Sequence, residues 1–301
     1  MEKIIIGTRG SKLALWQAHH LQEQLSSIGY ESELKIIKTK GDVVQNLSFD
    51  KIEGKGFFTK EIEDALLEHE IDIAVHSMKD LPTQHPEGLV IAGVSYREKA
   101  NDVMCIRPES SDKSRILNIK ENPVIGTSSA RRKAQIKALI KDVQIKDIRG
   151  NVPTRIEKLR QGQFDAIILA AAGIRRLQLD LSDLHVVYLH HDEFVPAPAQ
   201  GAVGFQCHEE NIRIRKILQK IHHKDVAQCT NVERKVLKKF DGGCHLPLGV
   251  HCYKDITGNY HCIAAYSPDH DSPLVKVKIS QNTSFGLAQK VFQLIKEKSN
   301  L

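Results

Sequence analysis

A cysteine on a glycine-flanked loop is the residue of this sequence that is best placed for covalent chemistry. Cys244 directly follows Gly242 and Gly243, and Pro247 lies a short way beyond it. The glycines can take positive φ and end the helix predicted before them, and the proline stiffens the exit. The loop therefore indicates either a thiol presented to a ligand or a small buried core cysteine near a turn, and by itself it leaves both interpretations open.

Arginines and hydroxyl residues recur where predicted strands end and predicted helices begin. A helix N-terminus offers unpaired backbone N–H groups, and an arginine fork beside it binds a carboxylate or phosphate well. Any one such arginine is more often a solvated surface residue, but the recurrence favours an anion-binding site. The places are Arg9 with Ser11, residues 127–132, residues 149–155 and the neighbourhood of Arg176.

One carboxylate stands among these cations. Asp80 follows a strand expected at 71–75, and ligands of open α/β sheets bind beyond the carboxyl ends of strands. Asp80 is either a structural ion-pair partner, for example of Lys79, or a group facing positive charge that develops on a substrate. Its spacing leaves these two roles open.

Composition limits the class of protein. The 301 residues suffice for two or three domains, and the hydrophobic fraction of 41% is ordinary for a globular chain. The net charge of +6 favours a polyanionic partner. Dispersed basic residues and 5% aromatics argue against nucleic-acid binding. Without a signal-like start, a membrane-length apolar run or paired cysteine spacing, we expect a cytoplasmic protein with reduced thiols.

Alternating strand and helix patterns predict an α/β protein, followed by a small α+β region. A capping box at 230–233 is expected to open the helix that leads to the cysteine loop. The other expected elements are strands at 3–7, 33–39, 71–75, 89–94, 124–126, 144–148 and 165–169, a helix from Ser11 to about 29, a polar loop at 40–60 followed by a helix to about 70, a hairpin at 250–254 and 260–266, a strand at 274–279 and a helix at 285–298.

Seven motifs, in order along nearly the whole chain, together resemble the hydroxymethylbilane synthase family, also called porphobilinogen deaminases. They lie at 8–18, 75–82, 126–132, 149–155, 169–176, 200–202 and 242–244. The resemblance implies two related α/β domains like those of periplasmic binding proteins and a small α+β third domain. Domain 1 would comprise 1–97 and 199–217, domain 2 would be 98–198, and domain 3 would be 218–301.

The resemblance also implies an enzyme that carries a dipyrromethane cofactor on Cys244 through a thioether. Four porphobilinogen molecules would be added stepwise, each losing ammonia, and hydrolysis would release linear hydroxymethylbilane. Each unit brings an acetate and a propionate, which accounts for the repeated arginine-bearing helix starts. Asp80 would be catalytic, stabilising a cationic azafulvene and assisting proton transfer.

Site roles follow by motif position. The expected cofactor-binding residues beside Cys244 are Ser77, Lys79, Thr127, Ser129, Arg131, Arg132, Arg149 and Asn151. The expected substrate-binding residues are Arg9, Ser11, Arg149, Arg155, Arg176 and Gln200, with Lys55 and Phe58 on a lid. The chain departs from the commonest family pattern at Ala199, where glycine is frequent, and at Gln206, which is often acidic.

Three alternatives remain. A two-lobed carboxylate receptor without catalysis explains the arginines but not the cysteine loop or Asp80, and a covalent adduct on the purified protein would exclude it. A nucleic-acid partner rests on charge alone. A metal site in domain 3 would use Cys244, His245, His251, Cys252, His261 and Cys262, but the pairs 251–252 and 261–262 are adjacent on predicted strands and so point to opposite faces. We therefore expect a monomer that binds porphobilinogen and no metal.

Overall fold

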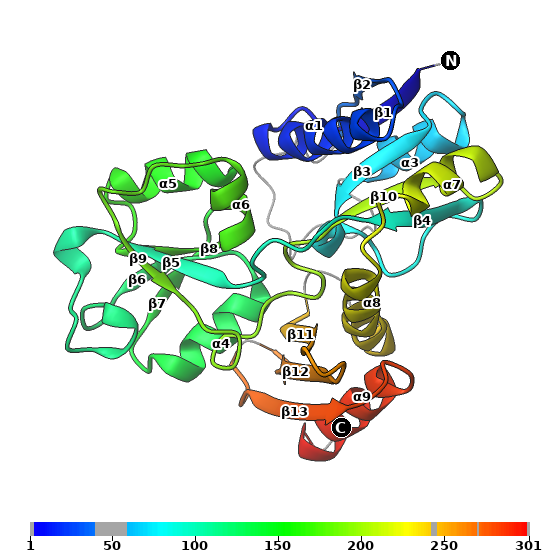
Figure 1. Cartoon of the computed structure of the whole chain (residues 1–301). Helices are drawn as coiled ribbons and strands as arrows, with labels where there is room; N and C mark the ends of the chain where they lie inside the picture. Colours follow the sequence, from blue (N-terminus) through cyan, green and yellow to red (C-terminus); the bar gives the residue numbers. More distant parts are fainter. Residues whose placement is uncertain (1–2, 40–58, 242–245, 270, 300–301) are drawn as a thin grey trace. The chain divides into compact units, whose positions relative to one another are not determined.

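The computed structural model describes residues 3–39, 59–241, 246–269 and 271–299 (Figure 1). These form two compact units: residues 3–39, 59–98 and 201–228 belong to unit 1, and residues 99–200, 229–241, 246–269 and 271–299 belong to unit 2. The three domain boundaries inferred from the sequence stay a prediction. No helix in the described part of the chain is both long and apolar enough to cross a membrane.

Unit 1 is built on a five-stranded sheet with the order β2-β1-β3-β10-β4. Its strands are β1 (Ile4–Thr8), β2 (Ser32–Ile36), β3 (Ile73–Ser77), β4 (Leu89–Val94) and β10 (Val203–His208). Strand β1 is parallel to β2 and β3, whereas β10 is antiparallel to both of its neighbours. Its helices are α1 (Lys12–Ser27), α3 (Lys60–Leu67) and α7 (Ile212–Gln219). Apolar residues of α1 and α7 pack on one set of strand side chains, and those of α3 pack on another.

The first sheet of unit 2 repeats this plan, with the order β7-β6-β8-β5-β9. Its strands are β5 (Asp102–Ile106), β6 (Val124–Gly126), β7 (Gln144–Lys146), β8 (Ala166–Ala170) and β9 (His185–Tyr188). Strand β6 is parallel to both neighbours, and β5 is antiparallel to both of its own. The two sheets thus share strand order and direction, which confirms the expectation of two related α/β parts.

Helices cover both faces of this sheet because successive strand residues point to opposite sides. Val103 and Cys105 of β5 pack with α5 (Val152–Arg160) and α6 (Ala171–Arg176). Met104 and Ile106 pack with α4 (Ala130–Leu139) instead. Figure 1 shows α5 and α6 on one side of the strands and α4 on the other.

A small antiparallel sheet forms the rest of unit 2. It has the order β11-β12-β13, with β11 at Leu248–Lys254, β12 at Tyr260–Tyr266 and β13 at Val275–Gln281. Buried side chains of α8 (Lys224–Lys239) and α9 (Leu287–Ser299) pack against one set of its residues. The expected hairpin and the small α+β region are confirmed. Three short 3-10 helices complete the description: η2 (Met78–Asp80), η3 (Pro108–Ser110) and η4 (Ile116–Asn118).

The capping-box prediction is wrong. Helix α8 begins at Lys224, so Thr230 and Glu233 lie within it and are fully buried. The Glu233 carboxylate accepts hydrogen bonds from the backbone N–H groups of Cys252 at 2.7 Å and Ala199 at 2.5 Å. Its carboxylate therefore satisfies backbone donors outside the helix instead of capping the helix start.

Candidate catalytic and anion-binding site

In unit 1, two of the predicted site segments meet at one edge of the sheet. Strands β1 and β3 are parallel, with Ile6 opposite Ile73, so the turn at Arg9–Ser11 and the loop after Ser77 follow neighbouring carboxyl ends. Ser11 is the N-cap of α1, and its Oγ accepts a hydrogen bond from the Ala14 N–H at 3.3 Å. The structure thus brings a helix start and the Asp80 loop to the same edge of the sheet.

The 3-10 turn η2 presents Asp80. Met78 and Leu81 on either side of the turn are 1% and 3% exposed, whereas Lys79 is half-buried and Asp80 is exposed. The Met78 N–H donates to the Ala202 carbonyl at 3.1 Å, which fixes the start of the turn to the chain leading into β10. Because both flanking side chains are anchored, the carboxylate is held outward on a rigid support.

Ser77 lies at the end of β3 and is tied to α1. The side-chain amide of Gln17 donates to Ser77 Oγ at 2.8 Å. This contact connects the helix that begins at Ser11 with the strand that carries Asp80. The geometry suits Ser77 for positioning the loop.

A buried polar cluster around Glu63 lies beside strand β3, which carries His76. Glu63 of α3 accepts hydrogen bonds from Gln206 at 2.9 Å and from Thr59 at 3.2 Å. Burial alone would raise the pKa of Glu63, but the nearby His85, whose Nδ1 lies 3.9 Å from the carboxylate, and the hydrogen bond from Gln206 lower it. Burial lowers the pKa of His76 to about 4, so this imidazole is neutral near pH 7. An acidic residue at position 206 would lie beside the Glu63 carboxylate and repel it. The glutamine found there donates a hydrogen bond to Glu63 instead, which explains this departure from the family pattern.

In unit 2, three helices begin at the carboxyl ends of the parallel strands. Helix α4 follows β6 with Ser129 as N-cap, α5 follows β7 with Asn151 as N-cap, and α6 directly follows β8. The Asn151 side chain accepts a hydrogen bond from the Thr154 N–H at 3.0 Å. Neighbouring parallel strands bring their ends to one edge, so these N-termini gather there and favour an anion.

The predicted arginines occupy two different settings. Arg155 is half-buried, and its Nε donates to the Gly150 carbonyl at 2.7 Å, while Arg149 is half-buried at the end of the preceding turn. Arg176 is 6% exposed and lies at the end of the short helix α6 rather than in its first turn. Arg131 and Arg132 are 5% and 6% exposed at the start of α4.

A buried aspartate, which the sequence analysis missed as a site residue, accounts for the last two arginines. Asp102 is fully buried at the start of β5. One carboxylate oxygen accepts from Arg131 Nη1 at 2.7 Å, and the other accepts from Arg132 Nη2 at 2.6 Å. Gln200 also donates to Asp102, at 3.1 Å. The sequence does carry a signal for this residue: Asp102 directly precedes the apolar run at 103–106. An acidic residue in that position is expected where a strand enters the core.

Charge holds this carboxylate ionised. Burial would raise the pKa of Asp102, but the positive charges of Arg131 and Arg132 lower it to about 2. Arg132 further donates from Nη1 to the Ile168 carbonyl at 2.8 Å, and Arg131 Nη1 donates to the Val195 carbonyl at 2.9 Å. The cluster therefore fixes α4 to β5, β8 and the chain before Gln200.

Thr127 and Gln200 also have structural partners. Thr127 is 1% exposed, and its Oγ1 accepts a hydrogen bond from the Ser129 N–H at 3.3 Å. Gln200 is 1% exposed and donates to the Ala100 carbonyl at 2.6 Å. Ala199 has φ of 60°, a left-handed conformation that glycine adopts without strain. The departure from the family pattern thus falls on a residue whose backbone favours glycine.

Three predicted site residues, Cys244, Lys55 and Phe58, lie outside the described residues. The five cysteines that the structure describes as free are all buried. Burial raises the pKa of Cys105 to about 12 and that of Cys207 to about 11, which leaves these thiols protonated and unreactive near pH 7.

Comparison with known proteins identifies the family. Residues 4–216 match the family model described as the porphobilinogen deaminase, dipyromethane cofactor binding domain. The porphobilinogen deaminase of Nitratiruptor sp. is 46% identical over 248 residues, covering 82% of this chain and 78% of that protein. The porphobilinogen deaminase of Campylobacter jejuni serotype O:2 is 42% identical over 264 residues, covering 87% of this chain and 84% of that protein.

Solved structures with a similar fold are more distant. The periplasmic VFT2 domain of Bordetella pertussis BvgS is 12% identical, with a TM-score of 0.43, over 74% of this chain and 90% of that chain. A periplasmic binding protein of an arginine transport system from Legionella pneumophila is 13% identical, with a TM-score of 0.41, over 73% of this chain and 92% of that chain. The family model and the identities above place this chain in the porphobilinogen deaminase family.

Proposed function

We propose that this chain is a hydroxymethylbilane synthase, a transferase of tetrapyrrole and heme biosynthesis. It joins four porphobilinogen molecules, with loss of ammonia at each addition, and releases linear hydroxymethylbilane by hydrolysis. Family membership supports this activity. The observation that carries the proposal is the exposed carboxylate of Asp80, held between the buried anchors Met78 and Leu81 at the carboxyl edge of a sheet.

Asp80 would act where positive charge develops. When ammonia leaves the substrate, the remaining carbon becomes electron-poor, and a fixed carboxylate stabilises that charge without reorganising. The same carboxylate can accept hydrogen bonds from pyrrole N–H groups and hold or move a proton at its oxygens. Lys79, adjacent to it, would bind a carboxylate of the bound pyrroles.

A dipyrromethane cofactor fits the donor set of unit 2. Its acetate and propionate groups need cationic forks and N–H donors, and this edge offers the N-termini of α4 and α5 with Arg149. When bound through Cys244, the cofactor supplies the primer to which new pyrrole units are joined. In this proposal Thr127, Ser129 and Asn151 orient its carboxylates, while Ser77 positions the Asp80 loop.

Arg131 and Arg132 contribute unequally to this proposal. Arg132 donates from Nε, Nη1 and Nη2 to Asp102 and Ile168. The hydrogen bonds that we find from Arg131 to described residues all come from Nη1. Arg131 therefore keeps donor groups for a cofactor carboxylate, whereas Arg132 acts chiefly by holding Asp102 and α4 in place.

The substrate carboxylates require further cations as the product grows. Arg9 and Ser11 stand at the start of α1, and Arg155 and Arg176 follow the strands of unit 2. We propose that these residues bind incoming porphobilinogen and the growing chain, and that Gln200 acts by supporting Asp102. The chain is proposed to work as a cytoplasmic monomer without nucleic-acid or membrane partners.

Intact-mass spectrometry separates this proposal from a non-catalytic carboxylate receptor. The active protein should be heavier than its sequence mass by a two-ring pyrrole adduct, located on the peptide containing Cys244. Incubation with porphobilinogen should give successively heavier covalent species. The Cys244→Ala protein should fold but carry no adduct and form no tetrapyrrole. An active enzyme of unmodified mass, or an adduct on another cysteine, would contradict the assignment of Cys244.

A further inference from the structure

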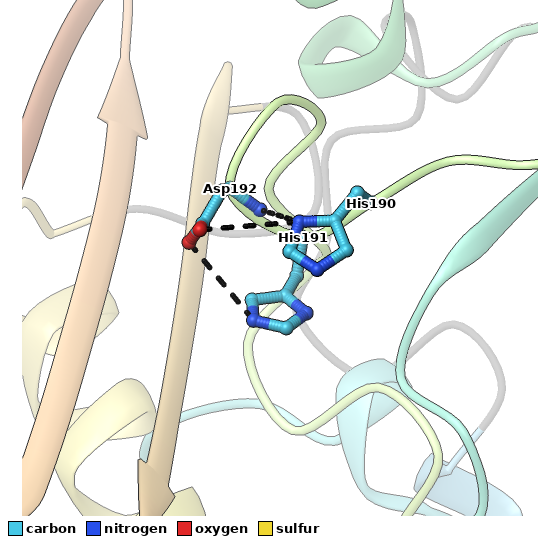
Figure 2. Close-up of side chains that lie close together, drawn as sticks. All are labelled: His190, His191 and Asp192. Atoms are coloured by element: carbon cyan, nitrogen blue, oxygen red, sulfur yellow. Dashed lines mark hydrogen bonds and ion pairs between the residues drawn. The ribbon is translucent and has the colours of Figure 1, made fainter.

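A short turn in unit 2 gathers three potential metal ligands that the proposed function does not use. His190, His191 and Asp192 follow β9, and one ligand atom from each lies within 4.8 Å of the others. Figure 2 shows both imidazoles turned toward the Asp192 carboxylate. His190 Nδ1 and His191 Nε2 are each 3.9 Å from an oxygen of Asp192. We propose that this turn binds one divalent transition-metal ion, such as Zn²⁺, through these three side chains.

The backbone holds the turn firmly in place. Leu189 before it is 2% exposed and Phe194 after it is fully buried. The Leu189 N–H donates to the Asp102 carbonyl at 2.9 Å, and the N–H groups of Glu193 and Phe194 both donate to the His190 carbonyl, at 3.0 and 2.8 Å. Both ends of the ligand-bearing segment are therefore anchored before any ion arrives, which reduces the ordering that binding requires.

Side-chain torsions can close these three ligands on an ion. Zinc bonds of about 2.0–2.2 Å to nitrogen and oxygen place tetrahedral ligand atoms roughly 3.4 Å apart. Each histidine lies 3.9 Å from a different Asp192 oxygen, and the three ligand atoms lie within 4.8 Å of one another, so their separations must shorten by about 0.5 to 1.4 Å. His190 and Asp192 are 60% and 42% exposed, so these torsions are open to them. Two imidazoles and one carboxylate form a ligand set suited to zinc, with the remaining position open to water.

Neighbouring groups define what the ion must displace. The Lys278 ammonium lies 3.4 Å from one Asp192 oxygen and 3.5 Å from the other. The Asp192 N–H also contacts His190 Nδ1 at 3.3 Å. The His191 ring lies 4.8 Å from the His251 ring and 5.7 Å from the Tyr253 ring, between centroids, which limits its orientation. Lys278 therefore competes directly with a cation for the carboxylate.

This competition provides a sharp test. Zn²⁺ is titrated into the full-length, cofactor-bearing protein at pH 7.5, and binding is followed by competition with a chromophoric chelator. Loss of a residue that merely supports a metal ligand weakens binding about 10–100-fold, so His190→Gln and Asp192→Asn should each weaken it at least about tenfold. Lys278→Gln should tighten it, because a competing positive charge is removed.

A second histidine pair supplies the matched control. His69 and His208 in unit 1 have ring centroids 4.9 Å apart. His69→Asn should leave Zn²⁺ binding unchanged, and asparagine tolerates the positive φ of this position.

Co²⁺ identifies the ligand type. Its absorption spectrum should show nitrogen and oxygen ligands without a thiolate charge-transfer band. The proposal is overturned if the wild type shows no saturable Zn²⁺ binding, if His190→Gln or Asp192→Asn binds as tightly as the wild type, or if Lys278→Gln binds no tighter. It is also overturned by a thiolate band with Co²⁺ or by equal weakening in His69→Asn.

Discussion

Replacing Asp102 with asparagine tests whether the buried charge cluster holds the second sheet together. Asparagine keeps the shape of the side chain but removes its charge and presents an NH₂ group to Arg131, Arg132 and Gln200, which are all donors here. Two buried guanidinium groups would lose their carboxylate partner. We expect Asp102→Asn to fold at low temperature but to have a much lower free energy of unfolding than the wild type.

Two arguments give the size of this loss. The positive charges of Arg131 and Arg132 lower the pKa of Asp102 to about 2, which corresponds to a stabilisation of a few kcal/mol in the folded protein, at about 1.4 kcal/mol per unit. Removal of one partner from a buried ion pair typically costs about 3–5 kcal/mol. We therefore expect Asp102→Asn to lower the free energy of unfolding by about 3 kcal/mol at pH 7.

The pH dependence has a defined sign. Because folding lowers the pKa of Asp102, its contribution is complete above the pKa of the unfolded chain, about 3.9, and is lost as pH falls toward 2. The difference in stability between the wild type and Asp102→Asn should therefore be constant from pH 7 to pH 5 and shrink below about pH 4.

Urea unfolding followed by circular dichroism measures this difference, and an exposed pair provides the control. Arg160 donates to Asp183 from Nε at 2.8 Å and Nη2 at 2.7 Å, the same fork chemistry at the surface. Asp183→Asn should cost less than about 1 kcal/mol, as is usual for an exposed ion pair. An Asp102→Asn loss no larger than that of the control, or one that stays constant down to pH 2, would refute the reasoning.

Three further outcomes are expected. Asp80→Asn should lower turnover by about 10²–10³-fold, the usual cost of one electrostatic stabiliser, while its melting temperature and cofactor mass stay normal; near-normal turnover would remove the catalytic role. Arg149→Ala should slow pyrrole addition with little change in thermal stability, and the reverse pattern would favour a purely structural arginine. Ala199→Gly should raise the free energy of unfolding by up to about 1 kcal/mol. Glycine removes the strain of a left-handed alanine backbone, about 1–2 kcal/mol, and this gain exceeds the cost of losing one buried methyl group, about 0.8 kcal/mol. A clear fall in the urea midpoint would contradict this prediction.

The sequence predicted the elements that depend on local signals. The helix after Ser11, the strand Leu89–Val94 and the hairpin at 248–266 appear close to their expected bounds, because caps and alternating apolar residues are visible in the chain itself. Strand β9 was not expected, because its sequence, His185–Tyr188, is short and carries a histidine and a tyrosine around only two valines. Its place at the sheet edge depends on pairing with β5, which no local pattern reveals.

Long-range contacts also explain the error at Glu233. A threonine three residues before a glutamate matches a helix start, but here the pair lies inside a helix and the glutamate binds distant backbone donors instead. Glu233 accepts from backbone N–H groups 34 residues before it and 19 residues after it. Only the fold brings those donors together, so local spacing gave the wrong helix start.

The Asp102 cluster shows which supporting residue the predicted arginine site leaves out. A cleft that binds several carboxylates needs cations that stay charged, but two adjacent buried guanidinium groups repel each other and lose hydration. One internal carboxylate neutralises one of the two charges and fixes both side chains, while Arg131 retains donors that the described contacts do not use. The pair therefore keeps one net positive charge beside the helix starts of unit 2. In the proposed anion site, a buried acid at the start of a neighbouring strand would therefore support the arginines, even though it cannot itself bind the anion.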